Sequence, residues 1–340
     1  MESETPDSSG RSAGGRRRWR WLAVVVVFIA ALLVAGAVYQ AVGAARDAGR
    51  YPAPGQRVDV GGYAMHIYCV GAGSPTVILD HIGDGNMGEW ALIQPVVAEE
   101  TRVCAYDRAG FGWSDPGPLP RDAQQSAREL DLLLTNAAVS GPYVLVGHSY
   151  GANVARVYAA QYPDDLAALV LVDPGYLHDR PGVPEDVNEQ WKREGRFIIG
   201  AAPWLTRIGF MRLGAAAGAL GYGELPAAQG EAFVAVQLTP KYGRAVADQY
   251  AAFEDTSAQV FAAEKALPPV PLLVLSAIEP EEDLSRRTWT EVNAGIAELV
   301  PEGEHRAVSG ASHMSLVLSR KHAAIVSQAI LEMVERVRAR

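Results

Sequence analysis

A valine-rich apolar run, a glycine-serine-glycine turn and a helix-like segment follow one another directly in the middle of this chain. The run begins at Tyr143 and reaches the G-x-S-x-G pattern of residues 147–151, with Ser149 at its centre, and the helix-like segment covers residues 152–161. Continuous apolar runs are typical of strands buried on both faces of a parallel sheet. A turn this tight leaves no room for side chains at the two glycines, and it presents the serine hydroxyl at a helix N-terminus. The pattern therefore predicts a strained, nucleophilic Ser149 above a buried strand.

The N-terminal part of the chain differs in composition from the rest. Residues 1–20 are rich in Ser, Gly and Arg and are predicted to be disordered. Residues 21–39 carry no charge and are about as long as a membrane-spanning helix, and more arginines precede this run than follow it closely. This bias predicts a single-pass membrane protein with a cytoplasmic N-terminus and an extracytoplasmic remainder. A cleaved signal peptide and a buried soluble helix are the alternative interpretations.

Strand-like and helix-like segments alternate in the remainder of the chain, after an Ala/Gly/Pro tether at residues 40–55. The glycine pair Gly61-Gly62 between two alternating runs predicts a hairpin. A hairpin followed by alternating strands and helices predicts an α/β fold with a doubly wound, mostly parallel, eight-stranded sheet. The predicted strands are residues 56–60, 63–70, 76–80, 102–106, the apolar run 143–146, 169–172, 272–276 and 305–308, and predicted helices include 88–100, 123–138, 283–300 and 321–338.

Three motifs resemble the α/β-hydrolase fold family, over a region from Gln56 to the C-terminus. They are the elbow at residues 147–151, the glycine-rich loop at residues 107–114 and the Gly-Ala-Ser-His run at residues 310–313. The resemblance implies a serine hydrolase of the esterase, lipase or proline-iminopeptidase-like branch. It also implies a catalytic core formed by two segments with a helical cap inserted between them; these are residues 56–174 and 270–340 for the core and 175–269 for the cap.

The family order of catalytic residues is serine, acid, histidine. His313 lies in a small-residue loop after the last strand, so it is predicted to be the base that takes the proton of Ser149. The family usually places the acid after the strand at 272–276, where Glu279 and Asp283 stand without the usual pattern. A known variation takes the acid from the end of the preceding strand, where Asp173 lies. A carboxylate buried at a strand end needs a partner, so Asp173 is preferred, with Asp283 and Glu279 as alternatives.

The resemblance also implies an oxyanion hole. The backbone N–H of Tyr150 is one predicted donor, and the loop after the third strand supplies the other. In that loop Ile82 stands where the family usually has glycine, and Gly83 is the predicted second donor.

Composition limits the partners. The chain has 340 residues and a net charge of −9, which argues against nucleic acid. No Cys/His cluster has zinc-ligand spacing, so no metal is predicted, and the expected chemistry needs no cofactor. The predicted function is a membrane-anchored serine hydrolase that cleaves an ester through an acyl-enzyme. The alternatives are an amidase, proline-iminopeptidase-like or haloperoxidase-like enzyme that acts on a small molecule, and a non-catalytic binding protein.

Two features of the sequence allow more than one interpretation. The segment at residues 197–220 carries only Arg207 and Arg212 as charges, but Pro203 and several glycines disfavour a second membrane span. Helices of the cap are the preferred interpretation, and an apolar lid that accepts an acyl chain is the more specific hypothesis. Cys69 and Cys104 lie in strands that neighbour each other in this fold, where either a disulfide or two buried thiols are expected.

Overall fold

An eight-stranded sheet in the order β1-β2-β4-β3-β5-β6-β7-β8 forms the centre of the molecule. The computed structural model describes residues 13–279 and 284–340. β1 and β2, and β2 and β4, pair antiparallel, and every other neighbouring pair is parallel, which confirms the predicted sheet. The strands are β1 (Gln56–Asp59), β2 (Ala64–Val70), β3 (Thr76–Asp80), β4 (Val103–Asp107), β5 (Tyr143–His148), β6 (Leu166–Val172), β7 (Leu272–Ile278) and β8 (Gly303–Ser309).

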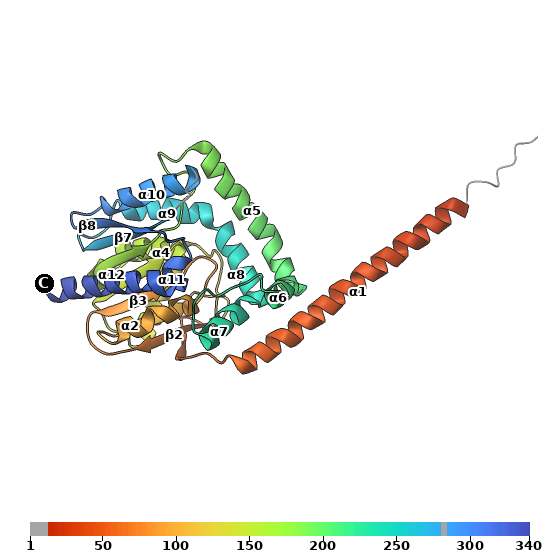
Figure 1. Cartoon of the computed structure of the whole chain (residues 1–340), viewed down its shortest axis with the longest axis horizontal. Coiled ribbons are helices and arrows are strands. Elements are labelled where there is room, and N and C mark those ends of the chain that lie inside the picture. The colour runs from red at the N-terminus through yellow and green to blue at the C-terminus, as the bar shows by residue number, and fades with distance from the viewer. Residues whose placement is uncertain (1–12, 280–283) are drawn as a thin grey trace, which may run out of the picture.

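Helices cover both faces of this sheet (Figure 1). All six residues of β5 are buried, and its side chains alternate between two apolar clusters: Leu145 packs on one side of the sheet, and Val144 and Val146 pack on the other. This two-sided burial explains the continuous apolar run in the sequence. The first face is covered by α3 (Ala123–Asn136), α4 (Tyr150–Gln161) and α10 (Leu284–Ala297), and the second by η1 (Met87–Leu92), α2 (Gln94–Ala98), α11 (Ser315–Leu318) and α12 (Arg320–Arg338).

Five helices lie between β6 and β7, in the segment predicted to be the cap. They are α5 (Glu185–Arg207), α6 (Phe210–Ala216), α7 (Ala227–Gln237), α8 (Pro240–Ala251) and α9 (Phe253–Glu264). The weakly charged segment 197–220 is divided between α5 and α6 by Gly209, whose φ is 72°. A left-handed glycine ends a helix, so this segment is divided between the end of α5 and the short helix α6 and does not form one continuous helix.

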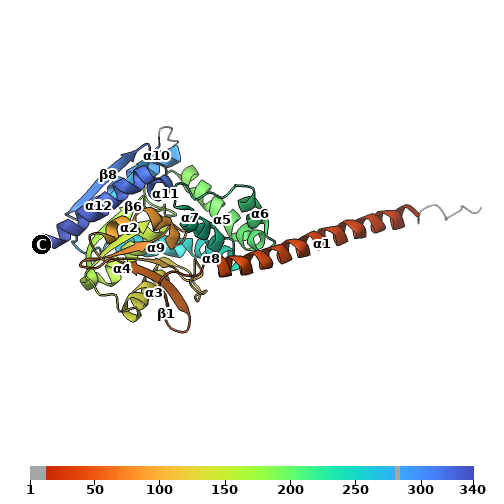
Figure 2. The same ribbon diagram turned by 60° about the horizontal axis from the view of Figure 1, so that its bottom comes forward.

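The N-terminal helix α1 (Ala13–Arg50) projects from the rest of the molecule (Figures 1 and 2). It begins inside the segment predicted to be disordered and continues to Arg50, so most of the predicted tether is helical. Helix formation propagates easily from an apolar nucleus through Ala and Arg, which are strong helix formers. Within the described residues, the stretch Arg17–Arg50 is the one helix long and apolar enough to cross a membrane, and the mean hydropathy of its 18-residue apolar window is 2.9.

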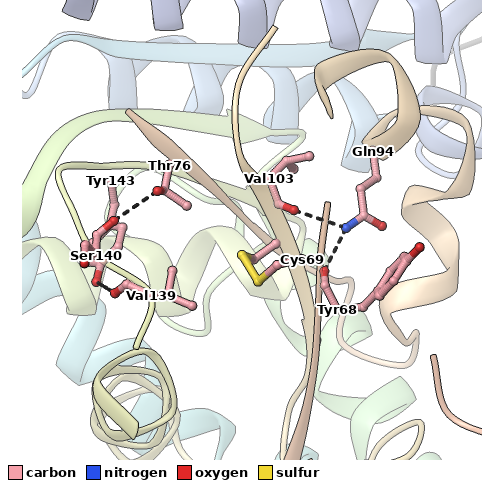
Figure 3. The surroundings of a disulfide bond; sticks show 9 residues. Tyr68, Cys69, Thr76, Gln94, Val103, Val139, Ser140 and Tyr143 are labelled. Atoms are coloured by element: carbon pink, nitrogen blue, oxygen red, sulfur yellow. Dashed lines mark hydrogen bonds between the residues drawn. A yellow bond between two sulfur atoms is a disulfide. The ribbon is translucent and has the colours of Figure 1, made fainter. Parts of the chain in front are cut away.

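The two cysteines form a disulfide that joins β2 and β4 (Figure 3). Cys69 and Cys104 face each other directly in the antiparallel register. Gln94 of α2 donates from Nε2 to the carbonyl of Tyr68 at 2.9 Å, beside the bridge (Figure 3). Of the two states expected from the sequence, the structure contains the bridged one.

We predict that the disulfide stabilises the folded state. The Cys69→Ser/Cys104→Ser variant should lose about 2–4 kcal/mol of unfolding free energy, because the bridge restricts the unfolded chain. Urea unfolding of the two proteins measures this difference. A thiol count on the denatured, unreduced wild-type protein is the control, and two free thiols in it would contradict the assignment.

Candidate functional site

Ser149 lies at a sharp turn between β5 and α4, with φ 54° and ψ −113°. The surrounding backbone explains both glycines of the motif. A Cβ atom on Gly147 would lie 2.4 Å from the backbone of Gly151, and one on Gly151 would lie 2.5 Å from the carbonyl oxygen of Asp80. Side chains cannot occupy either position, so the strained φ of Ser149 is maintained by packing on both sides.

Backbone hydrogen bonds with residues at the end of β6 hold this turn in place. The N–H of Ser149 donates to the carbonyl of Val172 at 3.0 Å, and the N–H of Gly175 donates to the carbonyl of Ser149 at 2.9 Å. The backbone of Ser149 is therefore tied to the segment that carries Asp173.

Ser149 and His313 line the same cavity, which has a volume of about 190 Å³. Residues that follow the core strands and residues of the helices between β6 and β7 both line this cavity. Most of the cap-side lining is aromatic, so the cavity combines polar groups from the core with an apolar wall. The aromatic lining residues from the segment between β6 and β7 are Tyr176, Tyr250 and Phe253, and Tyr150 of α4 and Trp289 of α10 add two more from the core.

His313 is hydrogen-bonded to Asp173, with 2.6 Å between Nδ1 and Oδ2. The imidazole ring also packs against Trp289, at 5.0 Å between centroids. Burial lowers the pKa of His313 below its usual range, although the carboxylate of Asp173 acts in the opposite direction. A neutral imidazole whose Nδ1–H is held by a carboxylate has Nε2 free to accept a proton, which is the state required of a general base.

Asp173 is buried at the end of β6 and has several partners besides His313. Arg286 donates to Oδ2 at 2.8 Å and Asn293 donates to Oδ1 at 3.3 Å. Burial would raise the pKa of Asp173, but its hydrogen bond to His313 and the charges of His313 and Arg286 hold it below the ordinary value. Asp173 is therefore ionised, as an orienting carboxylate must be.

Of the three acids considered from the sequence, Asp173 is the one that the structure places in contact with His313. Glu279 follows the end of β7, and Asp283 lies outside the described residues. Sequence reasoning did not identify Arg286 or Trp289, both on α10, because neither belongs to a recognisable motif.

The loop after β3 is held by buried polar groups. Arg108 donates to the carbonyls of His81 and Ile82, each at 2.6 Å, and also pairs with Asp80. The N–H of Ile82 donates to Oε1 of Glu89 at 3.1 Å, so this N–H is already engaged. Arg108 thus braces the loop through two of its carbonyls.

Gly83 and Tyr150, the two predicted oxyanion donors, lie together in the wall of the cavity. A Cβ atom on Gly83 would lie 3.3 Å from the Tyr150 side chain. The carbonyl of Gly83 accepts a hydrogen bond from Nε2 of Gln249 at 2.9 Å. Gln249 belongs to α8, so this helix holds the peptide group that follows Gly83. The N–H of Gly83 shares its peptide group with the carbonyl of Ile82, which accepts from Arg108.

Glu89 and His148 form a buried pair beneath the site that sequence reasoning missed. The distance from His148 Nδ1 to Glu89 Oε1 is 3.0 Å, and the rings of His148 and His313 are 4.7 Å apart between centroids. Burial raises the pKa of Glu89. The pair connects the loop after β3 to the elbow. His148 belongs to the elbow motif, but no sequence signal identifies Glu89 as its partner, because the two residues are 59 positions apart in the chain.

In residues 13–279 and 284–340, no three His, Cys, Asp or Glu side chains gather in an arrangement suited to a metal ion. Ser149 and His313 line the cavity together with Gly83 and Tyr150, and Asp173 is hydrogen-bonded to His313. These are the components required for acyl transfer to a serine.

Comparisons with known proteins agree with this architecture. Residues 75–196 match the model of the alpha/beta hydrolase fold family. The uncharacterized protein YqjL of Bacillus subtilis is 32% identical over 40% of this chain and 54% of its own length. A human (Lyso)-N-acylphosphatidylethanolamine lipase is 28% identical over 38% of this chain and 42% of its own length. The matches thus span about half the length of these curated relatives.

Solved structures align over a larger part of the chain. An esterase from Thermogutta terrifontis has a TM-score of 0.63 and 23% identity, and the alignment covers 83% of this chain and 99% of the esterase. The epoxide hydrolase CorEH has a TM-score of 0.65 and 21% identity, with 83% and 98% covered. With the sheet order, the strained elbow and the family match, these alignments show that the chain has the α/β-hydrolase fold.

Proposed function

We propose that this protein is a serine hydrolase that cleaves a carboxylic ester through an acyl-enzyme. The observation that carries the proposal is the position of His313, bonded to Asp173, in the same cavity as the strained Ser149. In this mechanism Nε2 of His313 takes the serine proton as Oγ attacks the carbonyl carbon. His313 then protonates the leaving alcohol, and water attacks the acyl-enzyme with His313 again as base.

The N–H groups of Gly83 and Tyr150 are the proposed donors to the oxyanion. Both flank the cavity, and a helix N-terminus adds its partial positive charge on the side of Tyr150. Because the N–H of Ile82 is engaged by Glu89, Gly83 is the better candidate in this loop.

The cavity favours an ester with a compact apolar group. Its volume of about 190 Å³ is smaller than the roughly 300–1,000 Å³ of typical ligand pockets, and its cap-side wall is aromatic. Esterases and lipases occur among the similar proteins. A serine at the elbow distinguishes the proposal from hydrolases that use an aspartate nucleophile there. A long acyl chain would fit only if the cap helices moved.

We also propose that α1 anchors the enzyme in a membrane, with the catalytic part extracytoplasmic. The apolar stretch within Arg17–Arg50 supports the anchor, because its most apolar part is not buried in the protein. The arginines that precede this stretch support the orientation. The end of α1 packs on the cap: Asp47 pairs with Arg212 at 2.6 Å, and Arg50 pairs with Glu231 at 2.8 Å. Gly36, inside the apolar run, packs against the carbonyl of Ile208 at the end of α5. Cleavage after the run would remove this contact, so it favours a retained anchor over a cleaved signal peptide.

Replacing Ser149 tests the proposed chemistry most directly. We predict that Ser149→Ala abolishes labelling by a fluorophosphonate and lowers kcat for a reactive ester by about 10⁴-fold or more, because the attacking oxygen is lost. Ser140→Ala, at an exposed serine before the same strand, should label as wild type does. A folded wild-type protein that does not label would favour the alternative of a non-catalytic binding protein.

The pH dependence tests the role of His313. It must be neutral to accept a proton, so kcat/KM should fall as the pH drops through its pKa, which lies below the ordinary value of about 6.5. The positive charge of Arg286 lowers that pKa. We therefore predict that Arg286→Met moves the acidic limb of the profile to higher pH, whereas Arg287→Met, at the exposed neighbour, does not. A shift to lower pH in Arg286→Met would contradict the proposed arrangement.

The size of the cavity predicts a preference for short acyl chains. Turnover of p-nitrophenyl esters should be highest for acetate to butyrate and should fall by about tenfold or more for laurate, because the aromatic wall blocks the longer chain. Phe253→Ala removes part of this wall and should reduce the difference between the two esters. Equal kcat/KM for butyrate and laurate in the wild type would show that the cap opens and that the enzyme accepts lipid-like substrates.

A further inference from the structure

A patch of aromatic and basic side chains is exposed on α5 and α6. Phe197 and Trp204 are 71% and 66% exposed, and Phe210 of α6 is 57% exposed. Outside α1, these are the exposed Phe and Trp side chains among the described residues, and Leu213 of α6 is also exposed. We call this surface the α5–α6 face; its exposed members are Arg193, Arg196, Phe197, Trp204, Arg207, Phe210 and Leu213.

The spacing shows that these residues share one side of the helix. Arg193, Phe197, Trp204 and Arg207 recur at intervals of four, seven and three residues, which places them in one stripe along α5. With the neighbouring Arg196 and with Phe210 at the start of α6, three arginines lie among three bulky aromatic side chains. Helices that lie in the interfacial region of a bilayer have this combination of Arg with Trp and Phe.

The α5–α6 face is continuous with the apolar part of α1. A Cβ atom on Gly36 would lie 2.3 Å from the carbonyl oxygen of Ile208, at the end of α5. One on Gly209 would lie 2.9 Å from the carbonyl oxygen of Gly36 and 3.2 Å from the ring of Tyr39. The turn between α5 and α6 therefore packs on α1 where the uncharged run 21–39 ends, which is the level of the membrane surface if that run spans the bilayer.

Polar contacts hold this junction on the side away from the apolar run. Arg212 donates to Gln40 at 3.2 Å and to Asp47 at 2.6 Å, and Gln40 donates to the carbonyl of Leu238 at 2.5 Å. Gln40 is almost fully buried. The position of α5 and α6 relative to the anchor is thus fixed by close backbone packing and by buried hydrogen bonds.

Figures 1 and 2 show how α5 is oriented. It runs across the direction of α1, and it lies at the edge of the body from which the apolar half of α1 projects (Figure 1). A helix that crosses a spanning helix at the end of its apolar run lies along the bilayer surface.

We propose that the α5–α6 face contacts the lipid surface of the membrane that α1 crosses. The proposal rests on the membrane anchor proposed above, and it adds a second contact with the same bilayer. It also relates the membrane to the catalytic site. A Cβ atom on Gly195 of α5 would lie 3.3 Å from the ring of Tyr250, which lines the cavity of Ser149. The helix α5 therefore lies between the lipid surface and Tyr250 in the cavity wall. The contact with lipid would keep the helices between β6 and β7 at a constant position relative to the membrane.

Site-directed fluorescence in proteoliposomes tests this contact. Both native cysteines are in the disulfide, so a single introduced cysteine in the full-length chain can be labelled with the fluorophore NBD. The test positions are Trp204→Cys and Phe210→Cys, which are exposed and should not disturb folding. Ile29→Cys reports on the anchor itself, and Ile325→Cys, exposed on α12, is the matched control away from the face. The vesicles contain phosphatidylcholine, phosphatidylglycerol and a doxyl-labelled lipid as quencher.

We expect blue-shifted emission at positions 204 and 210, with about twofold or greater quenching than at position 325. Quenching at position 29 alone would overturn the surface contact while the anchor remained supported. No quenching at position 29 would disprove the anchor and the contact together. Protection of positions 204 and 210 from the doxyl lipid, with cross-linking between introduced cysteines of two copies, would assign the face to self-association instead and would also overturn the proposal.

Discussion

The close approach of backbones around the serine turn is the constraint on which the rest of the site depends. Gly147 and Gly151 touch main-chain atoms so closely that no Cβ fits, and this contact keeps Ser149 at a positive φ. Packing that excludes alternatives can maintain a strained residue that would relax in isolation. The strand below and the helix above are both buried, so the strain is balanced by a large part of the core.

The second organising feature is the meeting of strand ends. β5, β6, β7 and β8 run parallel, so the residues after each of them emerge at the same edge of the sheet. This is how Ser149, Asp173 and His313 come together although they are far apart in the chain. Arg286 then neutralises the buried carboxylate from a helix on the sheet's first face. The cost of burying Asp173 is offset by these partners together.

The cap connects two regions that the sequence presents separately. Its helix α8 holds the loop of Gly83 through Gln249, and its helices α5 and α6 pack on α1. Movement of the cap relative to α1 would therefore change the wall of the cavity. The N-terminal helix is thus connected to the cavity of Ser149 through the helices between β6 and β7, by closely packed backbone and by the buried contacts of Gln40.

The sequence by itself determined the features that depend on neighbouring residues. The elbow around Ser149, the apolar run in α1 and the succession of strands and helices follow from local steric and hydrophobic patterns, whose periods are a few residues long. Placing His313 required only the position of the last strand. Whether the candidate acids Asp173 and Glu279 lie near it depends on how distant strand ends meet, which no local pattern contains.

Only the tertiary structure decided the contacts between distant segments. It paired Asp173 with His313, placed Arg286 and Glu89 around them, and extended α1 onto the cap. A buried charge must find a partner, but the sequence does not say which one, because partners separated by more than a hundred residues become neighbours only when the sheet has formed.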